Sequence, residues 1–358
     1  MKPEQQQIRV AIAGVGNCCQ ALLEGIEHYR RNPDDTRGLM HPEIGGYKVT
    51  DIVPVAAFDV NACKVGRDLS QAIYASPNMA YRYPGVQLKP LGVRVEMGPV
   101  LDGNPPQLES LVPTAGCEPC DVAGVLRASG AEMLLNFVPT ESHQAARLYA
   151  DAAIKDARIG FINGMPTLIV SDPGYQQAAL ESGVPLIGDD VKSQLGGTAI
   201  HRALASLFLS RGVHMSETYQ INFAGNTDFA NLTARGASKH KTKQEAVTSL
   251  MPYPVMISTG FTHVPLMKDR KTTMFWINGA NFGNAPLHLE AKLEVEDSAN
   301  FAGVMVDMIR YTRLALDRGV SGVLHSACSF LTKHPPDPIP DQEACARLEE
   351  FVAGTRER

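Results

Sequence analysis

This 358-residue sequence has no long apolar run, few cysteines and no excess of positive charge. No apolar stretch approaches the roughly 18 residues that a membrane-spanning helix needs, so we expect no membrane partner. The seven cysteines are an odd number, and the polar segment before Ile8 lacks the apolar stretch of a secretion signal. We therefore expect reduced thiols in a cytoplasmic protein. The 33 basic and 38 acidic residues give a net charge of −5, which argues against a nucleic-acid partner.

The sequence does contain enough apolar material for a large core, because 44% of its residues are hydrophobic. In the first 200 or so residues, short apolar runs alternate with segments of helical period, which predicts a parallel sheet with helices on both faces. The predicted strands are Ile8–Ala13, Val53–Asp59, Met133–Val138, Arg158–Ile162 and Val184–Gly188. We therefore expect an α/β fold whose residues 1–202 form a Rossmann-like, doubly wound domain. Met79–Cys117, rich in proline and glycine, indicates a long surface excursion.

The pattern changes after about residue 213. Leu287–Glu296 alternates apolar and polar side chains without a break, which is typical of a half-buried antiparallel strand. Further strands are predicted at Thr218–Phe223, Val255–Ser258 and Thr273–Asn278. We expect residues 203–302 to form a second, α+β domain. The amphipathic segment Ala302–Arg318 then opens residues 303–358, which we expect to return to the first domain.

A glycine-rich turn joins the first predicted strand to the first predicted helix, in the order Gly14-Val15-Gly16-Asn17-Cys18-Cys19. Gly14 permits the tight turn, and Gly16 lets a pyrophosphate approach the backbone at the helix N-terminus. Cysteine replaces the usual third glycine. Asp59 ends the next main strand, where an acid holds the adenosine ribose hydroxyls, and this favours NAD. The alternative interpretation is a plain glycine turn and a helix-capping aspartate.

Small and polar residues also follow the later predicted strands, at the edge where ligands of open α/β sheets bind. The further residues assigned to the cofactor are Asn17, Cys18, Asn136, Pro139, Gly164 and Asp189. The segment after Lys192 offers a hydroxyl, an amide and backbone N–H groups at the start of a predicted helix, which is typical of a phosphate site. The residues assigned to a substrate phosphate are Ser193, Gln194, Gly196, Gly197 and Thr198.

Positive charge is concentrated in Ser238-Lys239-His240-Lys241-Thr242-Lys243. On a helix, Lys239 and Lys243 would share a face and repel each other. A solvated charged face is one interpretation. The other is a pocket for a phosphorylated substrate, in which a crowded ammonium acts as acid or base. Lys271 and Lys333 are further cations outside amphipathic patterns. The lone pair Cys117 and Cys120 is weak evidence for zinc.

Taken together, these motifs resemble the inositol-phosphate synthase family, of the compact bacterial and archaeal type, over nearly the whole chain. The matching stretches are Gly14-Val15-Gly16-Asn17-Cys18, Gly38-Leu39-Met40-His41, Val55-Ala56-Ala57-Phe58-Asp59-Val60, Gly188-Asp189-Asp190-Val191-Lys192-Ser193-Gln194, Gly225-Asn226-Thr227-Asp228-Phe229, Ser238-Lys239, Asp269-Arg270-Lys271 and Leu293-Glu294-Val295-Glu296-Asp297-Ser298. The resemblance implies bound NAD and a redox-neutral cyclisation of glucose 6-phosphate, by C5 oxidation, enolisation, aldol closure and re-reduction. It also implies that residues 203–302 serve catalysis and oligomerisation, with a homotetramer formed through their sheet. It leaves room for a divalent or monovalent cation with unknown ligands.

The resemblance also implies roles for four lysines and two acids. Lys239 would serve proton transfer at the C5 oxygen, and Lys333 would stabilise the developing alkoxides. Lys243 and Lys271 would bind phosphate and assist enolisation. The residues that match family acids near the site are Asp190 and Asp297.

Two departures from the family pattern leave the substrate open. Phe261-Thr262-His263 stands where the family has Ser-Asp-aromatic or Ser-Asp-His, and Phe301 stands in place of a serine. The lysines match the family pattern, whereas these residues of the pocket wall do not. We therefore expect the chemistry of the family and leave the substrate open. The alternative substrate is fructose 6-phosphate, which would give a five-membered cyclitol phosphate. A simple NAD-dependent dehydrogenase and a non-catalytic NAD-binding regulator are the candidate functions of a different class.

Overall fold

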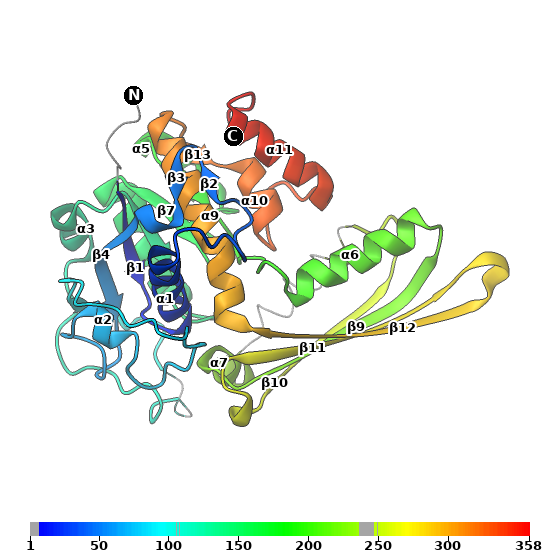
Figure 1. Ribbon diagram of the computed structural model, residues 1–358, viewed down its shortest axis with the longest axis horizontal. Coiled ribbons are helices and arrows are strands. Elements are labelled where there is room, and N and C mark those ends of the chain that lie inside the picture. Colours follow the sequence, from blue (N-terminus) through cyan, green and yellow to red (C-terminus); the bar gives the residue numbers. More distant parts are fainter. Residues whose placement is uncertain (1–6, 105, 107, 236–246, 249) are drawn as a thin grey trace.

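A computed structural model describes residues 7–104, 106, 108–235, 247–248 and 250–358. The described residues build two large sheets, one within a helix-covered body and one that extends away from it as a long curved layer, and a small two-stranded sheet (Figure 1). The predicted α/β class, with a Rossmann-like sheet and a second α+β part, is confirmed.

The first sheet has seven strands in the order β13-β8-β7-β6-β1-β4-β5, and every neighbouring pair is parallel. The strands are β1 (Ile8–Ala13), β4 (Ile52–Asp59), β5 (Val95–Met97), β6 (Met133–Asn136), β7 (Gly160–Asn163), β8 (Pro185–Ile187) and β13 (Gly322–Val323). Strand β5 lies inside the segment that composition indicated as a surface excursion, so part of that segment is core. The strand order reverses between β1 and β6, and ligands of doubly wound sheets bind at such a point.

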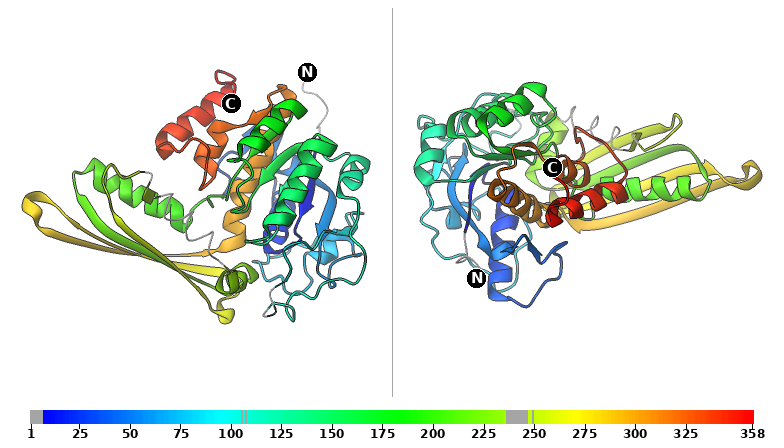
Figure 2. Two further views of the ribbon diagram at one scale, coloured as in Figure 1. Left: turned by 180° about the vertical axis from the view of Figure 1, so that it is seen from behind. Right: turned by 90° about the horizontal axis from the view of Figure 1, so that it is seen from above.

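Helices cover both faces of this sheet (Figures 1 and 2). On one face α1 (Asn17–Arg31) packs against α9 (Asp297–Asp317). The other face carries α3 (Val122–Ser129), α4 (His143–Asp151), the π-helical turn η2 (Ala152–Ala157) and α5 (Pro173–Ser182). Between β1 and β5 lie the smaller elements β2 (Glu43–Ile44), β3 (Tyr47–Lys48), η1 (Val49–Asp51) and α2 (Leu69–Ala72).

The second sheet has the order β10-β9-β11-β12. Its strands are β9 (His214–Ala224), β10 (Met256–His263), β11 (Arg270–Ala280) and β12 (Pro286–Glu296), with the turns η3 (Pro265–Met267) and η4 (Phe282–Asn284) between them. Strand β12 pairs antiparallel with β11 and alternates between exposed and partly buried residues, as its sequence predicted. Helix α6 (Gly197–Ser210) lies along one face, and α7 (Thr227–Arg235) lies at the inner end near β10 (Figure 1).

The chain after β12 packs on the first sheet. Helix α9 begins at Asp297 rather than at Ala302, because the Asp269 carboxylate accepts a hydrogen bond from the Ser298 backbone N–H at 3.0 Å and so caps the helix. Strand β13 then joins β8, and α10 (His325–Leu331) and α11 (Asp341–Ala353) follow. Within the described ranges, no helix combines the length and apolar character needed to cross a bilayer.

Candidate active site between the two sheets

The glycine turn after β1 has the shape that an anion site requires. Gly14 has a φ of +100°, and a Cβ there would lie 2.5 Å from the Phe137 carbonyl oxygen, so only glycine fits. Gly16 is the N-cap of α1 without a side-chain cap, and a Cβ there would meet nothing within 4 Å. The N-terminal N–H groups of α1 therefore border open space, and this cradle fits the pyrophosphate of a dinucleotide.

Asp59 stabilises this glycine turn through hydrogen bonds of its carboxylate. Its Oδ2 accepts a hydrogen bond from the Val15 N–H, and its Oδ1 accepts from the N–H groups of the next two residues, each at 2.8 Å. The Lys64 ammonium lies 3.8 Å from Asp59 Oδ2 and donates to the Val15 carbonyl oxygen at 2.8 Å. Asp59 and Lys64 both border the central cavity. No motif in the sequence identifies Lys64, which this fold brings under the turn.

The other residues assigned to the cofactor divide into two groups. Asn17, Cys18, Pro139 and Gly164 line the central cavity. Asn136 and Asp189 do not, and both are fully buried. Asn136 donates to Asn163 Oδ1 at 2.8 Å, and Asn163 in turn donates to Asp189 Oδ1 at 2.7 Å.

Three backbone N–H groups, of Ile169, Val170 and Ser171, also donate to the Asp189 carboxylate. Burial raises the pKa of this carboxyl, and these hydrogen bonds oppose the shift. Asn136 and Asp189 therefore connect neighbouring strand ends and the 169–171 loop through buried hydrogen bonds, and neither lines the cavity.

The predicted phosphate site lies at the start of α6. Gly196 is the N-cap of α6 without a side-chain cap, and Ser193, Gly196, Gly197 and Thr198 line the cavity. Thr198 is 4% exposed, and its Oγ1 has no hydrogen-bond partner. An unpaired buried hydroxyl is costly unless a ligand completes it, so this group is suited to an incoming anion.

Gln194, also assigned to the phosphate, lies elsewhere. Its Nε2 donates to the Gly38 carbonyl oxygen at 2.7 Å, and its side chain packs so closely on α9 that a Cβ on Gly303 would lie 2.0 Å from Oε1. Gln194 is not among the residues that line the cavity. It therefore fastens the turn before α6 to the first domain rather than facing a substrate.

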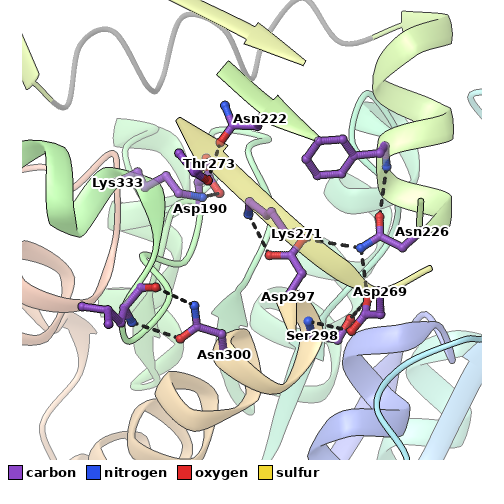
Figure 3. Close-up of polar contacts among 12 residues, drawn as sticks. Asp190, Asn222, Asn226, Asp269, Lys271, Thr273, Asp297, Ser298, Asn300 and Lys333 are labelled. Carbon is purple, nitrogen blue, oxygen red and sulfur yellow. Dashed lines mark hydrogen bonds and ion pairs between the residues drawn. The ribbon is translucent and has the colours of Figure 1, made fainter. Parts of the chain in front are cut away.

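Two lysine–aspartate pairs face the same cavity (Figure 3). The Lys271 ammonium, on β11, lies 2.7 Å from Asp297 Oδ1 at the start of α9. The Lys333 ammonium, after α10, lies 2.6 Å from Asp190 Oδ1, after β8. These pairs bring together four of the six residues predicted to be catalytic. The other two, Lys239 and Lys243, lie outside the described residues.

Beneath the Lys271–Asp297 pair lies a polar group that sequence reasoning missed. Asp269 is 1% exposed, and its carboxylate accepts hydrogen bonds from Asn226 Nδ2 at 3.0 Å and from Ser298 Oγ at 2.8 Å (Figure 3). Burial, together with the negative charge of Asp297, raises the pKa of Asp269 to about 7. Both Asn226 and Asp269 stand in matched motifs, so those motifs were the available signal.

Aromatic side chains form part of the cavity wall. Phe301, one helical turn after Asp297, packs against Phe137 with ring centroids 5.4 Å apart, and Phe261 packs against Phe229 at 5.9 Å. All four line the cavity. Thr262, another departure noted in the sequence, is exposed and does not line the cavity. Among these departures from the family pattern, Phe261 and Phe301 are therefore the ones that shape the pocket.

The cavity measures about 280 Å³. A single water needs only about 10–15 Å³ on this measure, so the space suits a ligand of many atoms. Its lining includes the N-termini of α1 and α6, which suit anions, and two paired ammonium groups, a combination suited to a nucleotide and a phosphorylated substrate. Among the described residues, no group of three or more His, Cys, Asp or Glu side chains could hold a metal ion.

Comparison with known proteins shows close relatives along the whole chain. A family described as Myo-inositol-1-phosphate synthase matches residues 196–298. The inositol-3-phosphate synthase of Mycolicibacterium smegmatis is 42% identical, over 99% of this chain and 100% of that protein. The inositol-3-phosphate synthase of Corynebacterium glutamicum is 43% identical, over 96% of this chain and 98% of that protein.

Solved structures agree with these sequence matches. A crystal structure described as Ari2 is 34% identical, with a TM-score of 0.79 over 97% of this chain and 99% of that chain. Inositol-3-phosphate synthase from Caenorhabditis elegans has a TM-score of 0.77 over 97% of this chain and 85% of that chain. At 18% identity, the second likeness shows the shared fold alone.

Proposed function

The chain belongs to the myo-inositol-1-phosphate synthase family, and from this premise we propose that it cyclises glucose 6-phosphate to an inositol phosphate with NAD as resident cofactor. It is an isomerase, as its named relatives are. The observation that carries the proposal is that one cavity is lined by the Gly14–Gly16 turn and by the pairs Lys271–Asp297 and Lys333–Asp190. A regulator that only binds a nucleotide has no need of two ammonium groups beside it.

The residues that would hold NAD are those of the first sheet. Gly14, Gly16 and the N-terminus of α1 suit the pyrophosphate, and Asp59 lies at the end of β4, where the adenosine ribose would be. NAD, when bound, takes a hydride from the sugar and returns it, so the reaction needs no external oxidant. A cation remains an additional proposal of the family resemblance, and assays with and without a chelator test it.

The lysines would act on charge that develops on the substrate. An unactivated C6–H is too weak an acid for a side-chain base, and a carbonyl at C5 makes its proton removable. The ammonium groups of Lys271 and Lys333 stabilise the oxygens that become negative as the enol forms and attacks the C1 aldehyde. Asp190 and Asp297 hold the two amines in place. The proposed catalytic set also includes Lys239, for proton transfer, and Lys243, for phosphate binding.

The phosphate of the substrate would lie at the start of α6. The N–H groups there are uncapped, and the buried Thr198 hydroxyl supplies a further donor. Together they compensate a permanent dianion. An anchored phosphate fixes the chain of sugar carbons, so that C1 and C6 are held within reach of each other.

The direct test incubates the purified protein with ¹³C-labelled glucose 6-phosphate and follows the carbon spectrum by NMR. We expect an inositol phosphate without net formation of NADH. Stoichiometric NADH would identify a dehydrogenase instead, and no reaction with either hexose phosphate, with NAD present, would overturn the catalytic proposal.

Phe301 favours a second candidate substrate. Its ring lies in the cavity wall beside Gly164, where a Cβ would lie only 3.0 Å from Phe301 Cζ. Such a wall changes the shape available to the sugar. Fructose 6-phosphate would give a five-membered ring by the same hydride and aldol steps. The same NMR assay with this ketose decides, and replacing Phe301 by serine should raise the ratio of kcat/KM for glucose 6-phosphate to that for fructose 6-phosphate by about tenfold.

We also propose that copies of the chain meet through the second sheet as a homotetramer. In the described part of the chain, no helix covers the face opposite α6 over most of its length (Figure 1), and Met256 and Met274 are 71% and 44% exposed. Large exposed apolar side chains in one area mark interaction surfaces. Light scattering of the purified protein measures the mass, and a monomer would contradict this.

A further inference from the structure

Asp269 is a buried acid outside the cavity, just before β11. Its carboxylate accepts from the Ser298 N–H at 3.0 Å, from Ser298 Oγ at 2.8 Å and from Asn226 Nδ2 at 3.0 Å. Its own carbonyl oxygen accepts from the Asp297 N–H at 3.0 Å. Asp269 therefore fixes the first turn of α9 from two directions, and that turn carries Asp297.

Asn226 extends this network to the site. Its Oδ1 accepts from the Phe229 N–H at 3.1 Å, which fixes the orientation of the amide. Its Nδ2 then lies between two acids, 3.0 Å from Asp269 Oδ1 and 3.4 Å from Asp297 Oδ2 (Figure 3). Asp297 in turn holds Lys271 at 2.7 Å. A continuous set of hydrogen bonds thus connects a buried carboxylate to an ammonium group in the cavity.

We propose that Asp269 is a positioning residue: its ionised carboxylate holds Asn226 and the first turn of α9, and thereby keeps Asp297 at Lys271. This inference rests on the proposed function, in which Lys271 stabilises charge on the substrate. The three donors around the carboxylate all favour its ionised form. Protonation would remove one acceptor and loosen the network.

Opposing effects set the pKa of Asp269, and they place it in the pH range in which enzymes commonly work. Burial and the charge of Asp297 raise the pKa of Asp269 to about 7, and the hydrogen bonds from Asn226 and Ser298 oppose the shift. From the 79–117 segment Tyr83 faces the same region, with its pKa raised to about 12 by burial and, in smaller part, by charges that include Asp269. The network reaches the cation Lys271 through its pair with Asp297. We therefore expect turnover to rise with pH through about 7.

The first experiment needs no catalysis. A carboxyl whose pKa is raised on folding stabilises the protein below its unfolded pKa, near 3.8, and this stabilisation is lost as the pH rises through about 7. Asp269→Asn removes the titration. The difference in Tm, variant minus wild type, should therefore increase from about pH 5 to about pH 8. The control is Asp121→Asn, because Asp121 caps α3 through the Gly124 N–H, away from the cavity. The difference in Tm between Asp121→Asn and the wild type should stay constant over the same pH range.

The second experiment reads the position of Lys271. Brief acetylation followed by mass spectrometry measures the labelling of Lys271, with the exposed Lys155 on η2 as internal reference. At pH 8, Asp269→Asn should increase the relative labelling of Lys271 about threefold or more, because the amine is no longer held by a fixed Asp297. Asp121→Asn should leave the labelling unchanged. The proposal is overturned if Asp269→Asn leaves the labelling of Lys271 unchanged and if its difference in Tm from the wild type does not vary with pH.

Kinetics complete the test. We expect Asp269→Asn to lower kcat about tenfold at pH 8 and to abolish its rise through pH 7, with KM changed less than about twofold, because the phosphate site is on α6. A uniform loss with the wild-type pH profile would mean that Asp269 has only a structural role. If the wild type turns over neither hexose phosphate, the proposed function fails. The Tm and labelling results still decide whether Asp269 positions Lys271.

Discussion

The two sheets border one cavity and contribute to it in different ways. The seven-stranded sheet has helices on both faces, so only its strand ends reach a ligand, and it contributes turns, helix N-termini and backbone N–H groups. The four-stranded sheet carries α6 on one face, and strand β11 presents Lys271 from its inner end. The first region, around the seven-stranded sheet, is suited to binding, because its turns and helix N-termini form a preformed site for an anion. The second supplies charge through a side chain whose direction depends on the register of β11.

This difference separates binding from chemistry in a way that substitutions can test. Changes in the first region should alter cofactor affinity, and changes on β11 should alter turnover. The two regions overlap at Asp190 and Lys333, since Asp190 follows β8, Lys333 follows α10, which packs against β8, and the two residues pair at the cavity. The proposed phosphate site at the start of α6 lies where the chain leaves the first sheet for the second.

The largest effect is expected on β11. Lys271→Met removes the ammonium group that faces the cavity, and kcat should fall about a thousandfold, because the loss of one preorganised electrostatic group costs about 10²–10³. NAD affinity, measured by calorimetry, should change less than about threefold, since the proposed cofactor residues lie in the first region.

Lys155→Met, on η2 and away from the cavity, is the control, because Lys155 is 51% exposed. It should leave kcat unchanged. A comparable loss of NAD affinity in Lys271→Met would break the division between the two regions.

The glycine turn should show the opposite pattern. Gly14→Ala places a Cβ 2.5 Å from the Phe137 oxygen at a φ of +100°. Strain of about 1–3 kcal/mol and a similar overpacking cost should lower the Tm and weaken NAD binding about thirtyfold or more.

Gly16→Ala sharpens this test, because its Cβ would enter the open space at the N-terminus of α1. We expect it to weaken NAD binding without lowering the Tm. Gly116→Ala, where a Cβ also meets nothing within 4 Å, should change neither quantity. Normal NAD affinity in Gly16→Ala would place the nucleotide elsewhere.

The smallest of these effects concerns Thr198. Thr198→Val removes the buried hydroxyl without a partner, so the Tm should be unchanged or higher. KM for the hexose phosphate should rise about tenfold, the value of one hydrogen bond to a charged group. Ser326→Ala removes another buried hydroxyl without a partner, away from the cavity, and KM should stay constant. An unchanged KM in both variants would remove Thr198 from the phosphate site.

Local sequence was sufficient where one short segment contains the whole signal. The strand, turn and helix around Gly14 form within a few residues, and the alternation along Leu287–Glu296 reports a strand with one buried face. Prediction was less successful at the ends of the later strands. Asn136 and Asp189 at strand ends and Gln194 before α6 are polar residues in the expected places, yet none of them lines the cavity. The direction of such a side chain depends on its neighbours in the fold.

The sequence by itself determined the class of fold, the position of the anion-binding turns and the lysines that could take part, because these depend on periodicity and on residue type. Only the tertiary structure decided which acid pairs with which lysine. Asp297 meets Lys271, and Asp190 meets Lys333 across a long separation in the chain. Asp269 and Lys64 join the site in the same way. Contacts of this kind form when separate elements pack, and no local pattern records them.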